Sequence, residues 1–152
     1  MQYSETQRRL SRLKAEAHLI GSKYSVNVNY DRTDGTWFHI TRMPIPIGWN
    51  RPTADILIDI PYGTPSYPQV APEWFWTNRD LVTSDGRAIG HFFKIGQHRV
   101  DQEHWDKGFG HFCIHVNSWH PVQGVTFEQG DTLLSYLHII MQVFYDREKL
   151  AQ

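Results

Sequence analysis

Apolar residues recur at helical spacing in a segment near each end of the chain. The first segment carries them at Leu10, Leu13, Ala17 and Ile20. Ser4 and Gln7 form a capping-box pattern, and glycine is a common residue just after a helix end, so a helix is predicted over Ser4–Ile20 with Gly21 as its stop. The second segment has its apolar stripe at Leu134, Leu137, Met141 and Phe144. It predicts a helix from about Asp131, which is expected to be its cap, to about Lys149.

Between these helices, apolar and polar residues alternate with a period of two, which is typical of strands with one buried face. Strands are predicted over Tyr24–Tyr30, Trp37–Met43, Ala54–Ile60 and Glu73–Thr77. The turn residues Asp34-Gly35 join the first two into a hairpin. The segments Pro44–Gly48 and Pro61–Pro72 are rich in proline, which cannot donate a ladder hydrogen bond, and are predicted as loops.

The alternation weakens between Asn78 and Gly110, and a long irregular loop that bears Cys113 is predicted here. Long loops within compact domains tend to carry function. The element order indicates a single α+β domain over residues 1–152. It consists of an N-terminal helix, a four-stranded antiparallel meander, the long loop and a crossover helix.

Composition narrows the range of functions. The chain has 152 residues, 40% hydrophobic, and a net charge of −1, so it lacks the strong basic bias of many nucleic-acid-binding domains. It opens with no apolar signal segment, and the longest apolar run, Leu133 to Tyr145, is too short to span a bilayer. One cysteine cannot form an internal disulfide. We expect a cytoplasmic protein that binds neither nucleic acid nor membrane and needs no cofactor.

That cysteine, Cys113, is the first candidate for chemistry. Free cysteines are often simply buried, so packing is one reading of it. The alternative is a nucleophile, because His111 and His115 stand two residues to either side. If this segment is extended, all three side chains share one face, where imidazoles can stabilise a thiolate or move a proton.

Three motifs occur in order around this cysteine: Tyr67-Pro68-Gln69-Val70-Ala71-Pro72 ahead of a strand, Gly110-His111-Phe112-Cys113, and Trp119-His120-Pro121 ahead of the last helix. Together they resemble the ubiquitin-conjugating enzyme family, most of all its divergent bacterial branch associated with ubiquitin-like conjugation systems and antiviral defence. The resemblance implies a UBC fold without the last two helices of that family. It also implies a transferase that accepts a ubiquitin-like modifier as a thioester on Cys113 and passes it to an amine of a protein substrate.

The resemblance assigns further roles. The family's asparagine that stabilises the oxyanion has no counterpart in the expected window, which reads Glu103-His104-Trp105. His104 is the first candidate to replace it, with His111, His115 and Asn117 behind it. The activating enzyme is expected to dock on the N-terminal helix, through Arg8, Arg9, Arg12 and Lys14.

Three alternatives stay open. The chain can be a UBC-like binding module without catalysis, since the asparagine is absent. It can be a cysteine hydrolase built on a Cys–His pair. It can also hold zinc, for which the candidate ligands are His111, Cys113 and His115 with His98, His104 or His120.

Overall fold

The computed structural model describes residues 4–88, 90, 92–93, 101–113, 116, 118–121 and 130–146, with the backbone alone of Phe93 and Cys113. It confirms the predicted α+β class. The helices are α1 (Glu5–Tyr24), α2 (Gln102–Asp106) and α3 (Leu133–Tyr145). The strands are β1 (Asn27–Tyr30), β2 (Trp37–Pro44), β3 (Thr53–Asp59), β4 (Trp74–Asn78), β5 (Phe92–Phe93) and β6 (Phe109–Cys113). None of the helices seen in the described ranges combines the length and the apolar character needed to cross a bilayer.

The start of α1 follows the sequence signal, but its end does not. Ser4 caps the helix, and the reciprocal bonds with Gln7 form the predicted capping box. The helix does not stop at Gly21 and runs on to Tyr24, with Ser25 in the left-handed conformation as its C-cap. A Cβ at Gly21 would lie 3.3 Å from the Val26 carbonyl oxygen, so this glycine allows the chain to turn back closely into β1.

The described strands form one six-stranded sheet in the order β1-β2-β3-β4-β6-β5, with antiparallel neighbours throughout. The meander β1–β4 matches the four predicted strands, except that β1 begins at Asn27 and not at Tyr24, which ends α1. The prediction that Cys113 lies in a long loop was wrong, because residues 109–113 form β6 and pair with both β4 and β5. The run Phe-Gly-His-Phe-Cys has little local strand signal, and its stability comes from these non-local partners.

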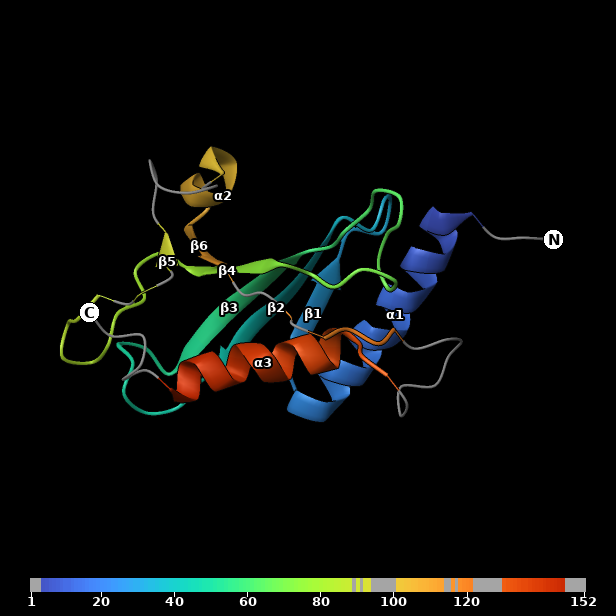
Figure 1. The fold of residues 1–152 in the computed structure, drawn as a ribbon. Helices are drawn as coiled ribbons and strands as arrows, with labels where there is room; N and C mark the ends of the chain where they lie inside the picture. Colours follow the sequence, from blue (N-terminus) through green and yellow to red (C-terminus); the bar gives the residue numbers. More distant parts are fainter. Residues whose placement is uncertain are drawn as a thin grey trace.

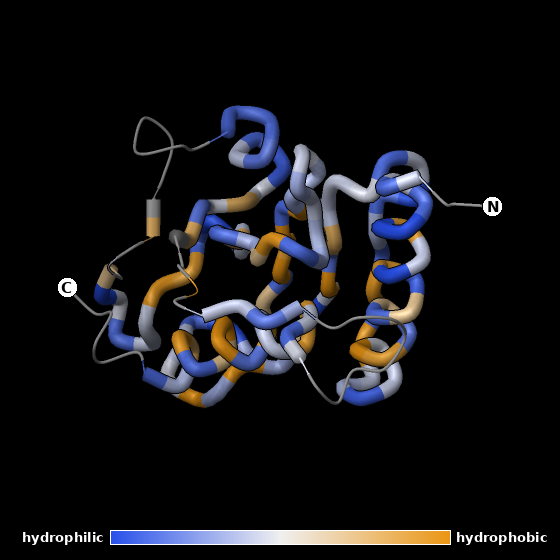
Figure 2. Tube along the Cα trace, turned by 45° about the vertical axis from the view of Figure 1, so that its right-hand side comes forward, coloured by the Kyte–Doolittle hydropathy of each residue, from blue (hydrophilic) through white to orange (hydrophobic). Residues whose placement is uncertain are grey.

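One face of the sheet packs against α1 and α3 and forms the core (Figure 1). Its members include Phe38, Ile56, Ile58, Phe75 and Phe112 from the strands, with Leu13, Leu137, Ile140 and Phe144 from the helices. The short α2 lies on the other side of the sheet from α3 (Figure 1). Figure 2 shows α2 coloured as hydrophilic, while the apolar stretches gather where the strands meet the long helices. The two faces of the sheet therefore differ in chemistry.

The end of β6 is held in register by aromatic stacking on the core face. The ring of Phe112 stacks on Phe75 at 5.1 Å and on Phe92 at 4.8 Å, with interplanar angles of 8° and 2°. The Phe92 ring also covers Gly110, where a Cβ would lie 2.2 Å from its nearest ring carbon. The glycine three residues before the cysteine is therefore required by packing.

Both ends of α3 are tied to distant segments. Thr132, and not the predicted Asp131, is the N-cap. The backbone N–H of Leu133 donates to the carboxylate of Glu16 on α1 at 2.6 Å. At the other end, the indole Nε1 of Trp49 donates to the Phe144 carbonyl at 2.9 Å. The helix is thus fixed against the sheet at both termini.

Candidate active site

β6 places the predicted nucleophile at its last residue. Cys113 is the register partner of Trp74 on β4, and His111 is the partner of Trp76. The expectation that His111 and Cys113 stand on one extended segment is confirmed. Because Phe112 belongs to the core face, the alternation of the strand assigns positions 111 and 113 to the opposite face. We call this opposite side of the sheet the polar face.

His111 is fully buried on the polar face. Its ring lies 5.7 Å from the centroid of Trp74 and 4.7 Å from that of Trp76. The two tryptophan rings therefore pack against His111 on the strand that ends at Cys113. Because His111 is fully covered, an approaching substrate cannot reach its ring from solvent in this state.

A carboxylate stands next to the same tryptophans. Asp59 is the last residue of β3, and the β3–β4 register, in which Leu57 faces Trp76, sets it across from Trp74. Its Oδ2 atom accepts hydrogen bonds from Nε1 of Trp74 and Nε1 of Trp76, both at 2.8 Å. The Asp59 carboxylate is thereby fixed by two donors from one neighbouring strand.

His104 reaches this carboxylate from α2. Its Nε2 lies 3.7 Å from Oδ1 of Asp59, and its Nδ1 lies 3.2 Å from Oδ1 of Asp101. The ring also rests against Trp76 at a centroid distance of 4.5 Å. Asp101 caps α2 through the backbone N–H of His104, so the cap and the imidazole are held together.

The two carboxylates favour a cationic His104. The contact with Asp59 raises the pKa of His104 above its usual value, partial burial opposes this, and the charges of Asp59 and Asp101 add to the rise. Burial by itself raises the pKa of Asp59, but the contacts with His104, Trp76 and Trp74 outweigh it and leave that pKa lowered. With 26% of its side chain exposed, His104 is partly accessible to solvent, whereas its Nδ1 atom is buried.

Sequence reasoning had named His104 but not its partners. Asp59, Asp101, Trp74 and Trp76 were absent from the predicted site. Two signals were available: tryptophans at alternate positions of β4 share one face, and an aspartate ended the neighbouring strand. Asp59 looked like an ordinary polar residue of an alternating strand, because nothing local indicated that His104 of α2 would contact it.

The remaining motif residues form a packed corner. Nε1 of Trp119 donates to the Pro68 carbonyl at 2.8 Å, and its ring lies 6.3 Å from that of Tyr67. Pro121 forms a parallel bridge with Asp131, just before α3. The Trp119 contacts join the segment after β6 to the segment before β4.

The sequence of this chain was compared with models of known protein families. Residues 14–143 match the model of the family described as Prokaryotic E2 family E. The chain belongs to this prokaryotic E2 family. No curated protein and no solved structure matched the chain. Family membership indicates a ubiquitin-conjugating-like role, and the matched span includes Asp59, His104 and Cys113.

The zinc alternative for this prokaryotic E2 finds no support in the described ranges, where no group of three or more His, Cys, Asp or Glu side chains is arranged to hold a metal. Of the proposed ligands, His98, His115 and the side chain of Cys113 lie outside the described part of the structure, as does the candidate Asn117. His120 lies elsewhere, with its ring 2.9 Å from Oγ of Ser118.

The predicted docking surface on α1 needs one correction. Arg9 is only 4% exposed, and its guanidinium donates to the carbonyl oxygens of Asp34 and Gly35 in the β1–β2 turn. It therefore supports the fold and is not available as an exposed docking residue. Arg12 is half-buried beside Glu16, and its charge lowers the pKa of that carboxyl.

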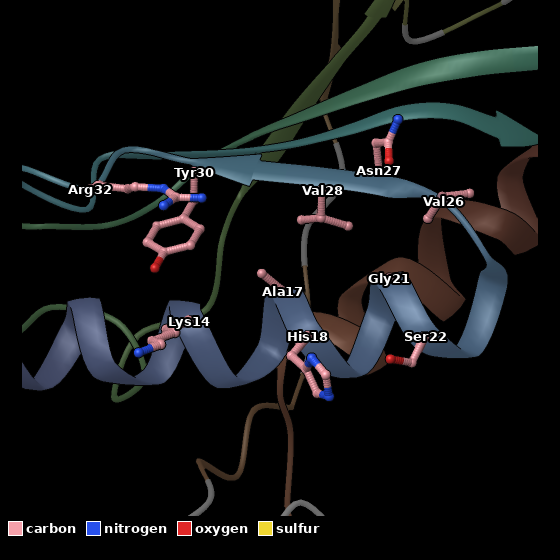
Figure 3. Close-up of a pocket in the computed structure, with 10 residues that line it drawn as sticks. All are labelled: Lys14, Ala17, His18, Gly21, Ser22, Val26, Asn27, Val28, Tyr30 and Arg32. Atoms are coloured by element: carbon pink, nitrogen blue, oxygen red, sulfur yellow. The ribbon is translucent and has the colours of Figure 1, made fainter.

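Arg8 and Lys14 remain exposed on α1. Lys14 borders an open groove of about 390 Å³ between α1 and β1 (Figure 3). His18 from the helix and Arg32 from beyond β1 line the same groove. Lys14 and Arg32 thus place positive charge at the groove, whereas Arg8 is not among its lining residues.

Proposed function

We propose that this prokaryotic E2 carries a ubiquitin-like modifier as a thioester on Cys113 and transfers it to an amine. The supporting observation is the position of the chain's one cysteine at the end of β6, beside the cluster of Asp59, His104, Trp74 and Trp76. Family membership supports the same role.

The chemistry consists of two acyl transfers. The Cys113 thiolate attacks the thioester carbonyl that joins the modifier's C-terminal residue to the activating enzyme, and the enzyme's thiolate leaves. An amine then attacks the Cys113 thioester, an amide bond forms, and the cysteine thiolate is released with loss of the amine proton. Each step passes through a tetrahedral oxyanion.

His104 is the proposed donor to this oxyanion. The 3.7 Å separation between its Nε2 and Asp59 is longer than a hydrogen bond, so this N–H is not fully engaged. A cationic donor is more effective than a neutral one, because it adds charge where negative charge develops. His111 is the weaker candidate because it is fully buried. Removing such a donor typically costs about 100-fold in rate or more.

The activating enzyme is proposed to dock over α1, with Arg8, Lys14 and the groove beside β1 as its contact surface. A cationic surface of this kind favours an acidic partner and speeds their encounter. The acceptor is proposed to be a protein amine.

The test combines this chain with an activating enzyme, its ubiquitin-like modifier and ATP, followed by gels run with and without reductant. The parent is expected to form an adduct that reductant removes, whereas Cys113→Ala forms none. Cys113→Ser is expected to form an ester adduct that resists reductant, which identifies the atom that carries the modifier.

A thermal melt of Cys113→Ala serves as the folding control. An adduct that persists in Cys113→Ala would assign the chemistry to another residue. A parent that binds the modifier but never forms an adduct would point to the binding-module alternative.

A further inference from the structure

The Asp59 carboxylate accepts two indole hydrogen bonds although it is exposed enough for water to solvate it. It stands on a sheet face with 36% of its side chain exposed, where water can solvate a carboxylate. Two tryptophan indoles nevertheless direct their N–H groups at its Oδ2 atom, both at 2.8 Å. Two donors to one oxygen fix the orientation of the carboxylate plane and leave Oδ1 as the atom that faces α2.

Oδ1 of Asp59 faces Nε2 of His104, and the imidazole has further contacts with Asp101 and Trp76. Asp101, at Nδ1, has 51% of its side chain exposed and lies on the same helix as His104. The Trp76 ring contacts the His104 ring at a centroid distance of 4.5 Å, and its Nε1 also donates to Asp59. Asp59 is therefore the charged group that links His104 to the sheet, beside the ring contact with Trp76, whereas Asp101 is the N-cap of α2 itself.

We infer that Asp59 is a positioning residue that sets the orientation and charge of His104 on the polar face beside Cys113, with Trp74 and Trp76 holding Asp59 in place. The inference rests on the proposed function, in which His104 donates to the oxyanion. Asp59 itself touches no reacting atom. Its role is to keep Nε2 protonated and in place.

The charged and titratable groups around His104 can be assigned by element. β3 contributes Asp59, and α2 contributes Asp101. β6 contributes His111, which lies behind Trp76 at a centroid distance of 4.7 Å. Glu103 and Lys107 on α2 pair with each other at 3.0 Å and largely cancel.

Asp59→Asn removes the charge while its amide oxygen can still accept from the indoles. The matched control is Asp101→Asn, which removes the other carboxylate and keeps α2 capped, since asparagine is a good N-cap. Two readouts separate the roles. The first is the titration of His104 followed by NMR of the imidazole, together with the indole N–H signals of Trp74 and Trp76. The second is discharge of the Cys113 thioester to an amine, measured against pH.

In Asp59→Asn the pKa of His104 is expected to fall further than in Asp101→Asn, because Asp59 is the less exposed and the larger contributor. Discharge is expected to slow by about 10-fold at the alkaline end of the profile, less than the ~100-fold loss expected for His104→Ala. Loading of Cys113 should change less than discharge. Replacing the Trp74 indole by phenylalanine should reproduce the effect in part.

An unchanged His104 pKa in Asp59→Asn overturns the inference, whatever the activity shows. A lowered pKa with parent-like discharge at every pH also overturns it, because the pair then serves structure alone. If the parent never loads Cys113, the proposed function fails and the inference built on it fails too. The NMR titration still reports separately whether Asp59 controls the charge of His104.

Discussion

Replacing Glu16 by glutamine should remove a pH dependence of stability that this one carboxyl creates. Glu16 on α1 is fully buried. It accepts hydrogen bonds from the Tyr67 hydroxyl at 2.6 and 2.7 Å and from the Leu133 backbone N–H at 2.6 Å. Burial raises its pKa from 4.5 to about 7, although Tyr67, Leu133 and Arg12 all act to lower it.

A raised folded-state pKa means that the folded protein binds more protons than the unfolded chain between pH 4.5 and about 7. The stabilisation from protonated Glu16 is therefore complete below pH 4.5 and is lost as the pH rises through 7. One pKa unit corresponds to about 1.4 kcal/mol, so the loss is on the order of 3 kcal/mol. Asp31 and Asp85, whose pKa values are lowered, act in the opposite direction, but only in more acidic solution.

The assay is chemical denaturation of the parent and Glu16→Gln at several pH values from 5 to 8. Glutamine resembles the protonated acid in shape, and its carbonyl can still accept from the Leu133 N–H. As the pH rises across this range, the free energy of unfolding of the parent should fall by about 3 kcal/mol relative to that of the variant. Glu73→Gln, at an exposed site, is the control and should run parallel to the parent.

Parallel curves for parent and Glu16→Gln would refute this reasoning. They would mean that Arg12 keeps Glu16 ionised at every pH tested. The variant would then lose the same stability throughout, about 3 to 5 kcal/mol, because an ion pair had been broken in the interior.

Two further changes test the packing around the site. Gly110→Ala would bring a Cβ to 2.2 Å from the Phe92 ring and should lower the free energy of unfolding, measured by denaturation, by about 1 to 3 kcal/mol. Gly63→Ala, where a Cβ meets nothing within 4 Å, is the control and should be close to neutral. Equal effects of the two would show that Phe92 does not cover Gly110. Trp49→Phe keeps a ring against Phe144 but leaves its carbonyl without the indole donor, so about 1 to 2 kcal/mol should be lost, and an unchanged melting temperature would contradict that contact.

Local signals in the sequence predicted local structure well. The capping box of Ser4 and Gln7 formed as expected because both partners lie within one turn. Gly21 failed as a stop because a glycine within a helix costs only about 1 kcal/mol and here allows close packing against Val26. Tertiary contacts therefore determined that α1 continues past Gly21.

The strand that ends at Cys113 was missed for a related reason. β6 is stabilised by β4 on one side and β5 on the other, and both lie outside its local sequence. Arg9 illustrates the same limit, since a charged helix residue looks solvated until the β1–β2 turn folds over it. Asp59 was likewise hidden, because its importance depends on α2 crossing the polar face.

The register of β6 links the fold to the proposed chemistry. A slip of one residue would move position 113 to the core face, since side chains alternate along a strand. Phe112 opposes such a slip because it is stacked between Phe75 and Phe92, and Gly110 opposes it because no other residue fits under Phe92. The aromatic core thus determines that the strand presents position 113 on the face where Asp59 and His104 lie. A variant that loosens this stack should therefore impair thioester formation even though it alters no group on the polar face.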